Sequence, residues 1–287
     1  MKFLVFGGGG QLATEIRLLS KSYAQHEFFF RTSSEVDITS ADAVNIAIET
    51  VLPNVVINAA AYTAVDKAES ESEKAFLINA EGVRNIAEGC KKRSIRLLHV
   101  STDFVFSGEA FRPYPTETLV SPVSVYGASK AKGEMYVRKI LPKLGLIART
   151  SWLYSSHSPC FLNTMRRLMS ERTELGVVCD QIGTPTSVTT LAEWLIYAAE
   201  ISLVGTYHVS DAGVGSWYDF ACAINEMGQE FGQLNTQCSV KPIMTFQFPT
   251  PARRPWYSVM DASGSFLLNG APKQFHWRER LTQTLLK

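Results

Sequence analysis

Several features that define other classes of protein are scarce or absent in this sequence of 287 residues. The five cysteines form no C-x-x-C pair and the histidines form no H-E-x-x-H motif, so we expect neither a metal site nor a disulfide framework. Lys and Arg number 28 against 27 Asp and Glu, which predicts no broad surface for nucleic acid or membrane. No apolar run is long enough for a signal peptide or a membrane span. We therefore expect a cytoplasmic protein.

Apolar residues, by contrast, are plentiful at 46%, enough for one large α/β unit or two domains. In the first half, short apolar segments alternate with amphipathic ones. The predicted strands are residues 2–6, 28–31, 55–58, 97–101 and 144–149, and the predicted helices are residues 12–24, 41–51, 71–92 and 127–141. This alternation predicts right-handed crossovers and a Rossmann-type, doubly wound parallel sheet in the α/β class.

The second half has a looser pattern. Residues 151–160 and 245–257 are rich in Ser, Pro, Trp and Tyr, which is typical of loops that line a pocket. The predicted helices here are residues 161–172, 191–201 and 218–231. We expect residues 1–150 to form a dinucleotide-binding domain. Residues 151–287 are expected to form mainly a smaller substrate-binding lobe, with some segments returning to the sheet.

A glycine turn directly after the first strand is the strongest local motif. Gly7, Gly10 and Ala13 have the spacing G-x-x-G-x-x-[G/A]. Glycine at the first two positions permits a tight turn and a close approach of backbone N–H groups to a pyrophosphate, and a small third residue lets the helix pack on the strand. Its position after the first strand of a βαβ series favours cofactor binding over an accidental run of glycines.

The end of the second predicted strand bears on the choice of cofactor. Many NAD-binding folds have an acidic residue here, which bonds the ribose diol. This sequence has Arg31 followed by hydroxyl side chains, which suits a 2′-phosphate and predicts NADPH, with NADH as the second option. An ordinary surface arginine is the alternative interpretation. Asp37 follows where an adenine would rest, or it caps the next helix.

A tyrosine and a lysine four residues apart suggest the chemistry. On a helix, Tyr126 and Lys130 share one face, so the ammonium is expected to lower the pKa of the phenol. The phenol can then protonate a carbonyl oxygen as hydride arrives at its carbon. Thr102 and Asp103 end the fourth strand, where such sheets bind ligands, and Thr102 could bond the same carbonyl. The alternative is a capped turn. Together these sites predict an oxidoreductase.

Seven segments carry a resemblance to a known family. They are GGGGQL (7–12), NAAAYTAVDKAE (58–69), STDFVFSG (101–108), PVSVYGASK (122–130), RTSWLY (149–154), DQIGTPT (180–186) and PTPARRP (249–255). The chain resembles the dTDP-4-dehydrorhamnose reductase family of the extended short-chain dehydrogenase/reductase superfamily over most of its length. The resemblance implies reduction of the C4 keto group of dTDP-4-dehydro-L-rhamnose to dTDP-L-rhamnose with hydride from NADPH.

The resemblance also implies roles for individual residues. Tyr126 would be the proton donor, with Lys130 as its partner and Thr102 as a third catalytic residue. The residues implied to bind the dinucleotide are Gly10, Gln11, Leu12, Asp37, Ile38, Ala61, Tyr62 and Thr63, beside the Gly7 and Arg31 proposed above. Those facing the sugar nucleotide would be Thr102, Asp103 and Trp152. Paired N–H bonds from Arg253 or Arg254 could hold a diphosphate, although adjacent arginines can simply flank a turn.

Departures from related patterns leave alternatives open. Phe104 stands where these reductases often have Tyr, and where the Thr-Asp-Glu motif of nucleotide-sugar dehydratases has Glu. A dehydratase is thereby disfavoured. The remaining alternatives are a reductase or epimerase of another nucleotide sugar, and a non-catalytic NADP-binding regulatory subunit like those of methionine adenosyltransferase. A nucleotide sugar is the expected small-molecule partner, and a homodimer is one option for the assembly.

Overall fold

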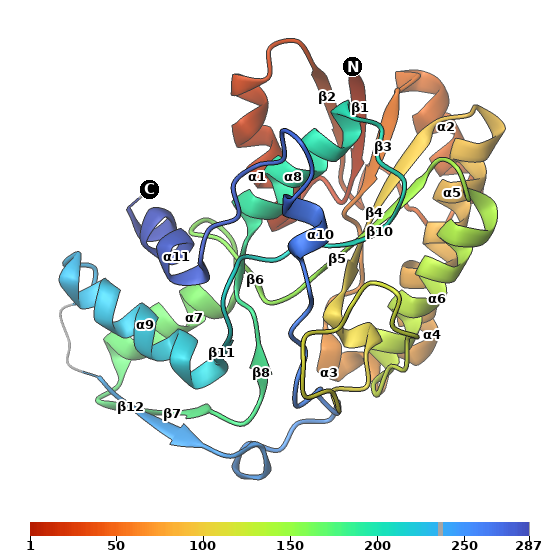
Figure 1. The fold of residues 1–287 in the computed structure, drawn as a ribbon. Coiled ribbons are helices and arrows are strands. Elements are labelled where there is room, and N and C mark those ends of the chain that lie inside the picture. Colours follow the sequence, from red (N-terminus) through yellow and green to blue (C-terminus); the bar gives the residue numbers. More distant parts are fainter. Residues whose placement is uncertain (235–237, 287) are drawn as a thin grey trace.

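A parallel sheet forms the centre of the protein in this computed structural model, which describes residues 1–234 and 238–286. Over these residues the sheet has six strands in the order β10-β5-β4-β3-β1-β2 (Figure 1). The strands are β1 (Lys2–Phe6), β2 (Glu27–Arg31), β3 (Val55–Asn58), β4 (Arg96–Thr102), β5 (Gly145–Thr150) and β10 (Gly205–His208). The strand order reverses direction between β1 and β3, so the carboxyl ends of these strands form a switch point where such sheets bind ligands. The predicted Rossmann-type sheet is confirmed.

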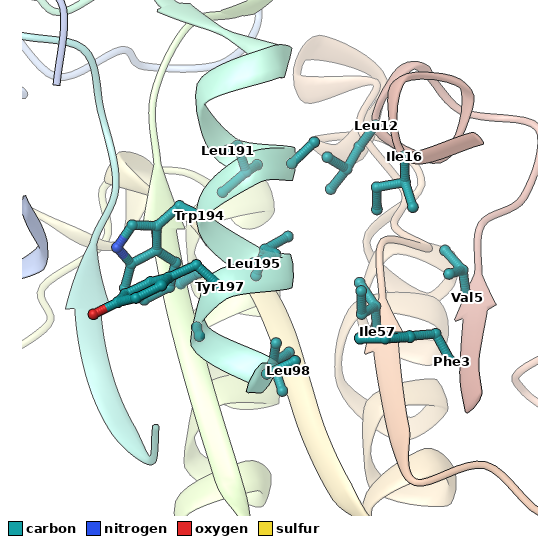
Figure 2. Packing of buried hydrophobic residues seen from close by; sticks show 14 of the residues in the cluster. Phe3, Val5, Leu12, Ile16, Ile57, Leu98, Leu191, Trp194, Leu195 and Tyr197 are labelled. Carbon is teal, nitrogen blue, oxygen red and sulfur yellow. The ribbon is translucent and has the colours of Figure 1, made fainter. Parts of the chain in front are cut away.

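Helices cover both faces of the sheet. Helices α1 and α8 pack together on one face, whereas α2, α5 and α6 lie on the other (Figure 1). Their bounds are α1 (Gln11–Leu19), α2 (Ala41–Val51), α5 (Val83–Lys92), α6 (Val125–Ile140) and α8 (Val188–Glu200). Figure 2 shows Leu12 and Ile16 of α1 beside the strand residue Val5. Because apolar side chains are buried on both faces, strands such as β3 are apolar rather than alternating.

Shorter elements connect these layers. They are η1 (Ser20–Ser22), α3 (Val65–Ala68), α4 (Ser72–Phe76), the π-helical turn η2 (Leu77–Gly82) and η3 (Asp103–Val105). The predicted helix 71–92 is therefore a succession of α4, η2 and α5. The predicted helix 12–24 is too long, because α1 ends at Leu19 and the polar residues after it bury no side chain.

The remaining elements form a lobe with a separate apolar core (Figure 1). Its helices are α7 (Phe161–Glu171), α9 (Trp217–Glu230) and α11 (Trp277–Leu285), and β7 (Glu174–Val178) pairs in parallel with β12 (Ser239–Ile243). Two short pairs join the lobe to the sheet layer, β6 (Leu153–Tyr154) with β9 (Thr186–Ser187) and β8 (Ile182–Gly183) with β11 (Gly215–Ser216). The last short elements are η4 (Thr245–Gln247) and α10 (Ser263–Phe266). No helix within the described ranges has both the length and the apolar character needed to cross a membrane.

Candidate active site

A cavity of about 920 Å³ lies at the carboxyl ends of the central strands. Most of the residues predicted from the sequence line it: Gly7, Gly10, Gln11, Leu12, Asp37, Ile38, Ala61, Tyr62, Thr63, Thr102, Tyr126, Lys130 and Trp152. Four predicted residues are not part of its lining: Arg31, Asp103, Arg253 and Arg254. The cavity volume lies within the range usual for small-molecule and cofactor sites, about 300–1,000 Å³.

The glycine turn at the end of β1 has the geometry of an anion site. Gly7 has φ of +84°, and a Cβ atom there would lie 2.6 Å from the backbone nitrogen of Ala60. The N–H group of Gly10 donates to the carbonyl of Gly7 (2.9 Å), and Gly10 caps α1 without a side-chain hydrogen bond. The first-turn N–H groups of α1 therefore point from a positive helix end toward a cavity that Gln11 and Leu12 line. This arrangement fits a pyrophosphate.

At the end of β2, Arg31 does not line the cavity, as a phosphate-binding arginine would be expected to do. The Arg31 guanidinium donates to the carbonyl of the preceding Phe30 (3.0 Å), and Thr32 and Ser33 line the cavity instead. Glu35 accepts hydrogen bonds from the N–H and hydroxyl of Thr32, and these bonds lower the pKa of Glu35. The turn after β2 therefore carries the Glu35 carboxylate as well as the Arg31 guanidinium.

Asp37 lines the same cavity. Its carboxylate accepts from the N–H and hydroxyl of Thr39, at 2.9 and 2.8 Å. The next helix, α2, is capped by Ser40 and not by Asp37. Asp37 therefore shapes the turn before the cap, and its side chain lies at the cavity wall.

Tight packing at the start of α6 positions Tyr126. Ser124 caps this helix by accepting from the N–H of Gly127, and a Cβ atom at Gly127 would collide with the backbone carbonyl of Phe104. The helix can thus lie directly against η3. The Phe104 ring meets the Tyr126 ring edge to face, with centroids 5.5 Å apart. Phe104, which was noted in the sequence for its missing hydroxyl, is therefore a packing partner of the catalytic candidate.

The pKa of Tyr126 corrects one expectation. Burial raises the pKa of this phenol to about 12; a hydrogen bond with Thr102 opposes the rise and the charge of Asp103 adds to it. The predicted lowering by Lys130 is wrong for this structure, because the ammonium donates to the carbonyl of Val100 (2.6 Å) instead. A phenol with so high a pKa is fully protonated at neutral pH, which is the state that a proton donor needs.

Lys130 belongs to a buried polar network that the sequence did not reveal. It is only 3% exposed, and burial lowers its pKa to about 8, against the charge of Glu134 one helical turn further on. Glu134 is itself fully buried; it accepts from Ser101 (2.6 Å) and from Nε and Nη2 of Arg149 (2.9 and 2.8 Å). The network ties α6 to β4 and β5 below the cavity.

Thr102 and Asp103 have different positions. The hydroxyl of Thr102 lines the cavity, donates to the carboxyl of Asp103 (2.9 Å) and accepts from the N–H of Phe104 (3.2 Å). Asp103 lies behind it, 1% exposed, and burial raises the pKa of its carboxyl to about 6, against hydrogen bonds with Ser258 and Thr102. The cap predicted as the alternative is therefore present, and the same hydroxyl also reaches the site.

Asn79 is a further residue that the sequence reasoning missed. Its amide accepts from the N–H of Tyr62 (2.8 Å), donates to the carbonyl of Tyr62 (3.0 Å) and donates to the hydroxyl of Ser129 (2.9 Å). It joins the loop of Ala61 and Thr63 to the helix of Tyr126. Asn79 lies in the π-helical turn η2, which apolar periodicity cannot detect.

The two adjacent arginines lie outside the cavity. Arg254 forms an ion pair with Asp66 (2.8 Å), which lowers the pKa of that carboxyl, and Arg253 is mostly exposed beside Glu109 (3.9 Å). Their role toward a diphosphate stays a prediction. Ser151, Ser158 and Pro159, from the loop expected to line a pocket, do line the cavity. Among the residues that the structure describes, no three His, Cys, Asp or Glu side chains group as metal ligands.

Comparisons with known proteins find several dTDP-4-dehydrorhamnose reductases among the similar proteins. Residues 1–287 match the family described as the RmlD substrate binding domain. A dTDP-4-dehydrorhamnose reductase from Aggregatibacter actinomycetemcomitans is 40% identical over 266 residues, which cover 91% of this chain and 90% of that protein. The crystal structure of a reductase of the same name from Clostridium acetobutylicum has a TM-score of 0.93 and 38% identity, covering 99% of this chain and 98% of that one. Another, from Bacillus anthracis in complex with NADP, has a TM-score of 0.92 and 35% identity, with the same coverage.

Proposed function

The chain belongs to the RmlD substrate binding domain family, together with dTDP-4-dehydrorhamnose reductases, and from this premise we propose that it is such a reductase. It would reduce the C4 keto group of dTDP-4-dehydro-L-rhamnose to give dTDP-L-rhamnose, with NADPH as the reductant. One observation supports this most strongly: the glycine turn of a dinucleotide site and the pair Tyr126–Lys130 line the same cavity.

The residues of the first half fit NADPH. The uncapped N-terminus of α1 would bind the pyrophosphate, and the loop of Ala61, Tyr62 and Thr63 would border the nicotinamide half. Thr32 and Ser33 offer hydroxyls near the 2′-position, and Arg31 would contribute its charge by turning away from the Phe30 carbonyl. When bound, NADPH supplies the hydride for the carbon of the keto group.

Residues of the protein would transfer the proton to the substrate. Tyr126 would donate its phenolic proton from Oη to the C4 oxygen, and its pKa of about 12 keeps that proton in place until the oxygen becomes basic. Thr102 lines the cavity, and it would turn its single Oγ1 hydrogen from the Asp103 carboxyl to the same oxygen. The buried ammonium of Lys130 would bond a ribose hydroxyl and so hold the nicotinamide beside the substrate.

The two halves of the chain would bind different ligands. Residues 1–150 would bind mainly the dinucleotide, and residues 151–287 mainly the sugar nucleotide, with Trp152 beside the sugar or base and Arg253 or Arg254 at the diphosphate. A homodimer in the cytoplasm is the expected form. Light scattering on the purified protein tests the assembly, and cell fractionation tests the location.

The test of activity is product analysis. The protein is incubated with dTDP-glucose, the upstream dehydratase and epimerase, and NADPH, and the nucleotide sugars are separated by chromatography. Formation of dTDP-L-rhamnose with matching loss of NADPH is the expected result. Activity on another 4-keto sugar nucleotide would keep the mechanism but change the substrate. NADPH binding without turnover of any such sugar would instead favour the non-catalytic regulatory subunit.

A further inference from the structure

Trp152 has an unusual backbone for a bulky residue, with φ of +48°. The other described non-glycine residues with positive φ are Leu52, Ser94 and Ser202. Each lies one or two residues after the end of a helix, where this conformation is common. Trp152 instead follows strand β5 and lines the cavity. Such strain persists only where the surroundings impose it, and it concentrates at functional sites.

A second tryptophan covers one face of the Trp152 indole. The rings of Trp152 and Trp217 are stacked, with centroids 3.6 Å apart and planes 6° apart. Trp217 is the first residue of α9, where the capping box of Ser216 and Asp219 fixes the helix start, and Phe161 of α7 packs on Trp217 with centroids 4.6 Å apart. Trp217 does not belong to the cavity lining. It therefore contacts the site only through Trp152.

The backbone of Gly183 also lies against the Trp152 indole. A Cβ atom at Gly183 would lie 2.6 Å from the Trp152 ring, although the backbone of Gly183 is not in the left-handed region. The neighbouring chain is also anchored to this segment, because Ser151 donates to the carbonyl of Thr184 (2.8 Å) and the N–H of Thr186 donates to the carbonyl of Trp152 (3.3 Å). Trp217 and Gly183 thus hold the indole in place, and Trp152 borders the cavity.

We infer that Trp217 is a positioning and specificity-determining residue, which holds Trp152 as a rigid wall for the sugar-nucleotide substrate. The inference rests on the proposed function. The stack attaches Trp152 to the C-terminal lobe, because Trp217 packs with the separate core of that lobe. By holding Trp152, the lobe sets the width of the cavity on the substrate side, although Trp217 itself does not line the cavity.

The experiment compares four variants. Trp217→Ala removes the support, Trp217→Phe keeps an aromatic face, and Gly183→Ala displaces the indole without imposing backbone strain. Phe231→Leu is the matched control, because it removes an aromatic ring of the same core at the far end of α9, about 20 Å from Trp217 at 1.5 Å per residue. The measurements are kcat and KM for the 4-keto sugar nucleotide, NADPH affinity, calorimetric binding of dTDP-L-rhamnose, and the exciton couplet of the stacked tryptophans in circular dichroism.

Trp217→Ala and Gly183→Ala should raise KM and the Kd for dTDP-L-rhamnose about threefold to tenfold, the size expected for losing an ordered aromatic contact. The rate kcat and the affinity for NADPH should change less than KM. Trp217→Ala should lose the exciton couplet, and Trp217→Phe should recover most of the affinity. The Phe231→Leu control should lower thermal stability but keep both KM and the couplet.

Two outcomes separate the inference from the proposed function. A Trp217→Ala protein that loses the couplet but keeps wild-type KM and Kd would overturn this inference alone. An equal rise in KM for the Phe231→Leu control would also overturn it, since general loosening of the lobe would then explain the effect. A wild-type protein that neither reduces the keto sugar nor binds dTDP-L-rhamnose would refute the proposed function, and the inference with it.

Discussion

The two ends of the cavity are built in different ways. At the β1 end, residues 7–13 contribute backbone N–H groups and a glycine with positive φ to the wall. At the β5 end, the wall is the Trp152 side chain, and residues 183 and 217 hold it from far along the chain. A backbone site suits a cofactor shared by many enzymes, whereas a wall made of side chains from several segments can be changed to suit a substrate.

Loss of the proton donor Tyr126, which lies between these two ends of the cavity, should lower kcat more than any other change. Tyr126→Phe keeps the ring against Phe104 but removes the phenolic proton, so kcat should fall about 10²–10⁴-fold. NADPH affinity, measured by fluorescence titration, should be nearly unchanged. Tyr136→Phe is the control, because Tyr136 lies on the same helix but donates to Glu81 outside the cavity. Comparable turnover in Tyr126→Phe and wild type would exclude Tyr126 as the donor.

The backbone end is tested next by Gly7→Ala. The new Cβ meets the backbone of Ala60, and a left-handed conformation costs about 1–2 kcal/mol for a residue with a Cβ. We expect a lower melting temperature and NADPH binding weakened about five- to thirtyfold, as that strain is relieved by opening the turn. Gly264→Ala should change neither quantity, because nothing lies within 4 Å of the added carbon. Unchanged NADPH affinity in Gly7→Ala would mean that the turn does not form the pyrophosphate site.

The pH dependence should report on Lys130. Its pKa of about 8 means that the ammonium is present below that pH and is lost as the pH rises. Tyr126 stays protonated through this range, so kcat/KM should fall about tenfold between pH 7 and pH 9 as Lys130 deprotonates. In Lys130→Arg, whose charge persists, the profile should be flat over the same range even if the absolute rate is lower. A wild-type profile that is flat to pH 9 would contradict this role.

The smallest expected effect is on the choice between NADPH and NADH. The Arg31 side chain is half-buried and bonds the Phe30 carbonyl, so a contact with a 2′-phosphate would be partly solvated. Arg31→Ala should weaken NADPH relative to NADH only about twofold to fivefold, as measured by the ratio of kcat/KM values. An unchanged ratio would assign the discrimination to Thr32 and Ser33 instead.

Local patterns predicted the sheet and the backbone end of the cavity because short-range chemistry decides both. The strand 2–6, the glycine spacing and the Tyr126–Lys130 pair each depend on a few consecutive residues. The pKa of Tyr126 was mispredicted because it depends on burial and on Val100, which competes for the ammonium of Lys130. The Trp152–Trp217 stack joins residues 65 positions apart, and no sequence motif around either residue indicates the contact.

The proposed mechanism brings hydride and proton to one carbonyl in this cavity. It is tested most directly with NADPH deuterated at C4 of its nicotinamide on the transferred face, with the sugar product examined by nuclear magnetic resonance. We predict one deuterium at C4 of the rhamnose unit of dTDP-L-rhamnose with the wild-type protein, and almost no labelled product with Tyr126→Phe. Consumption of NADPH without deuterium at C4, or equal labelling by Tyr126→Phe, would contradict the account.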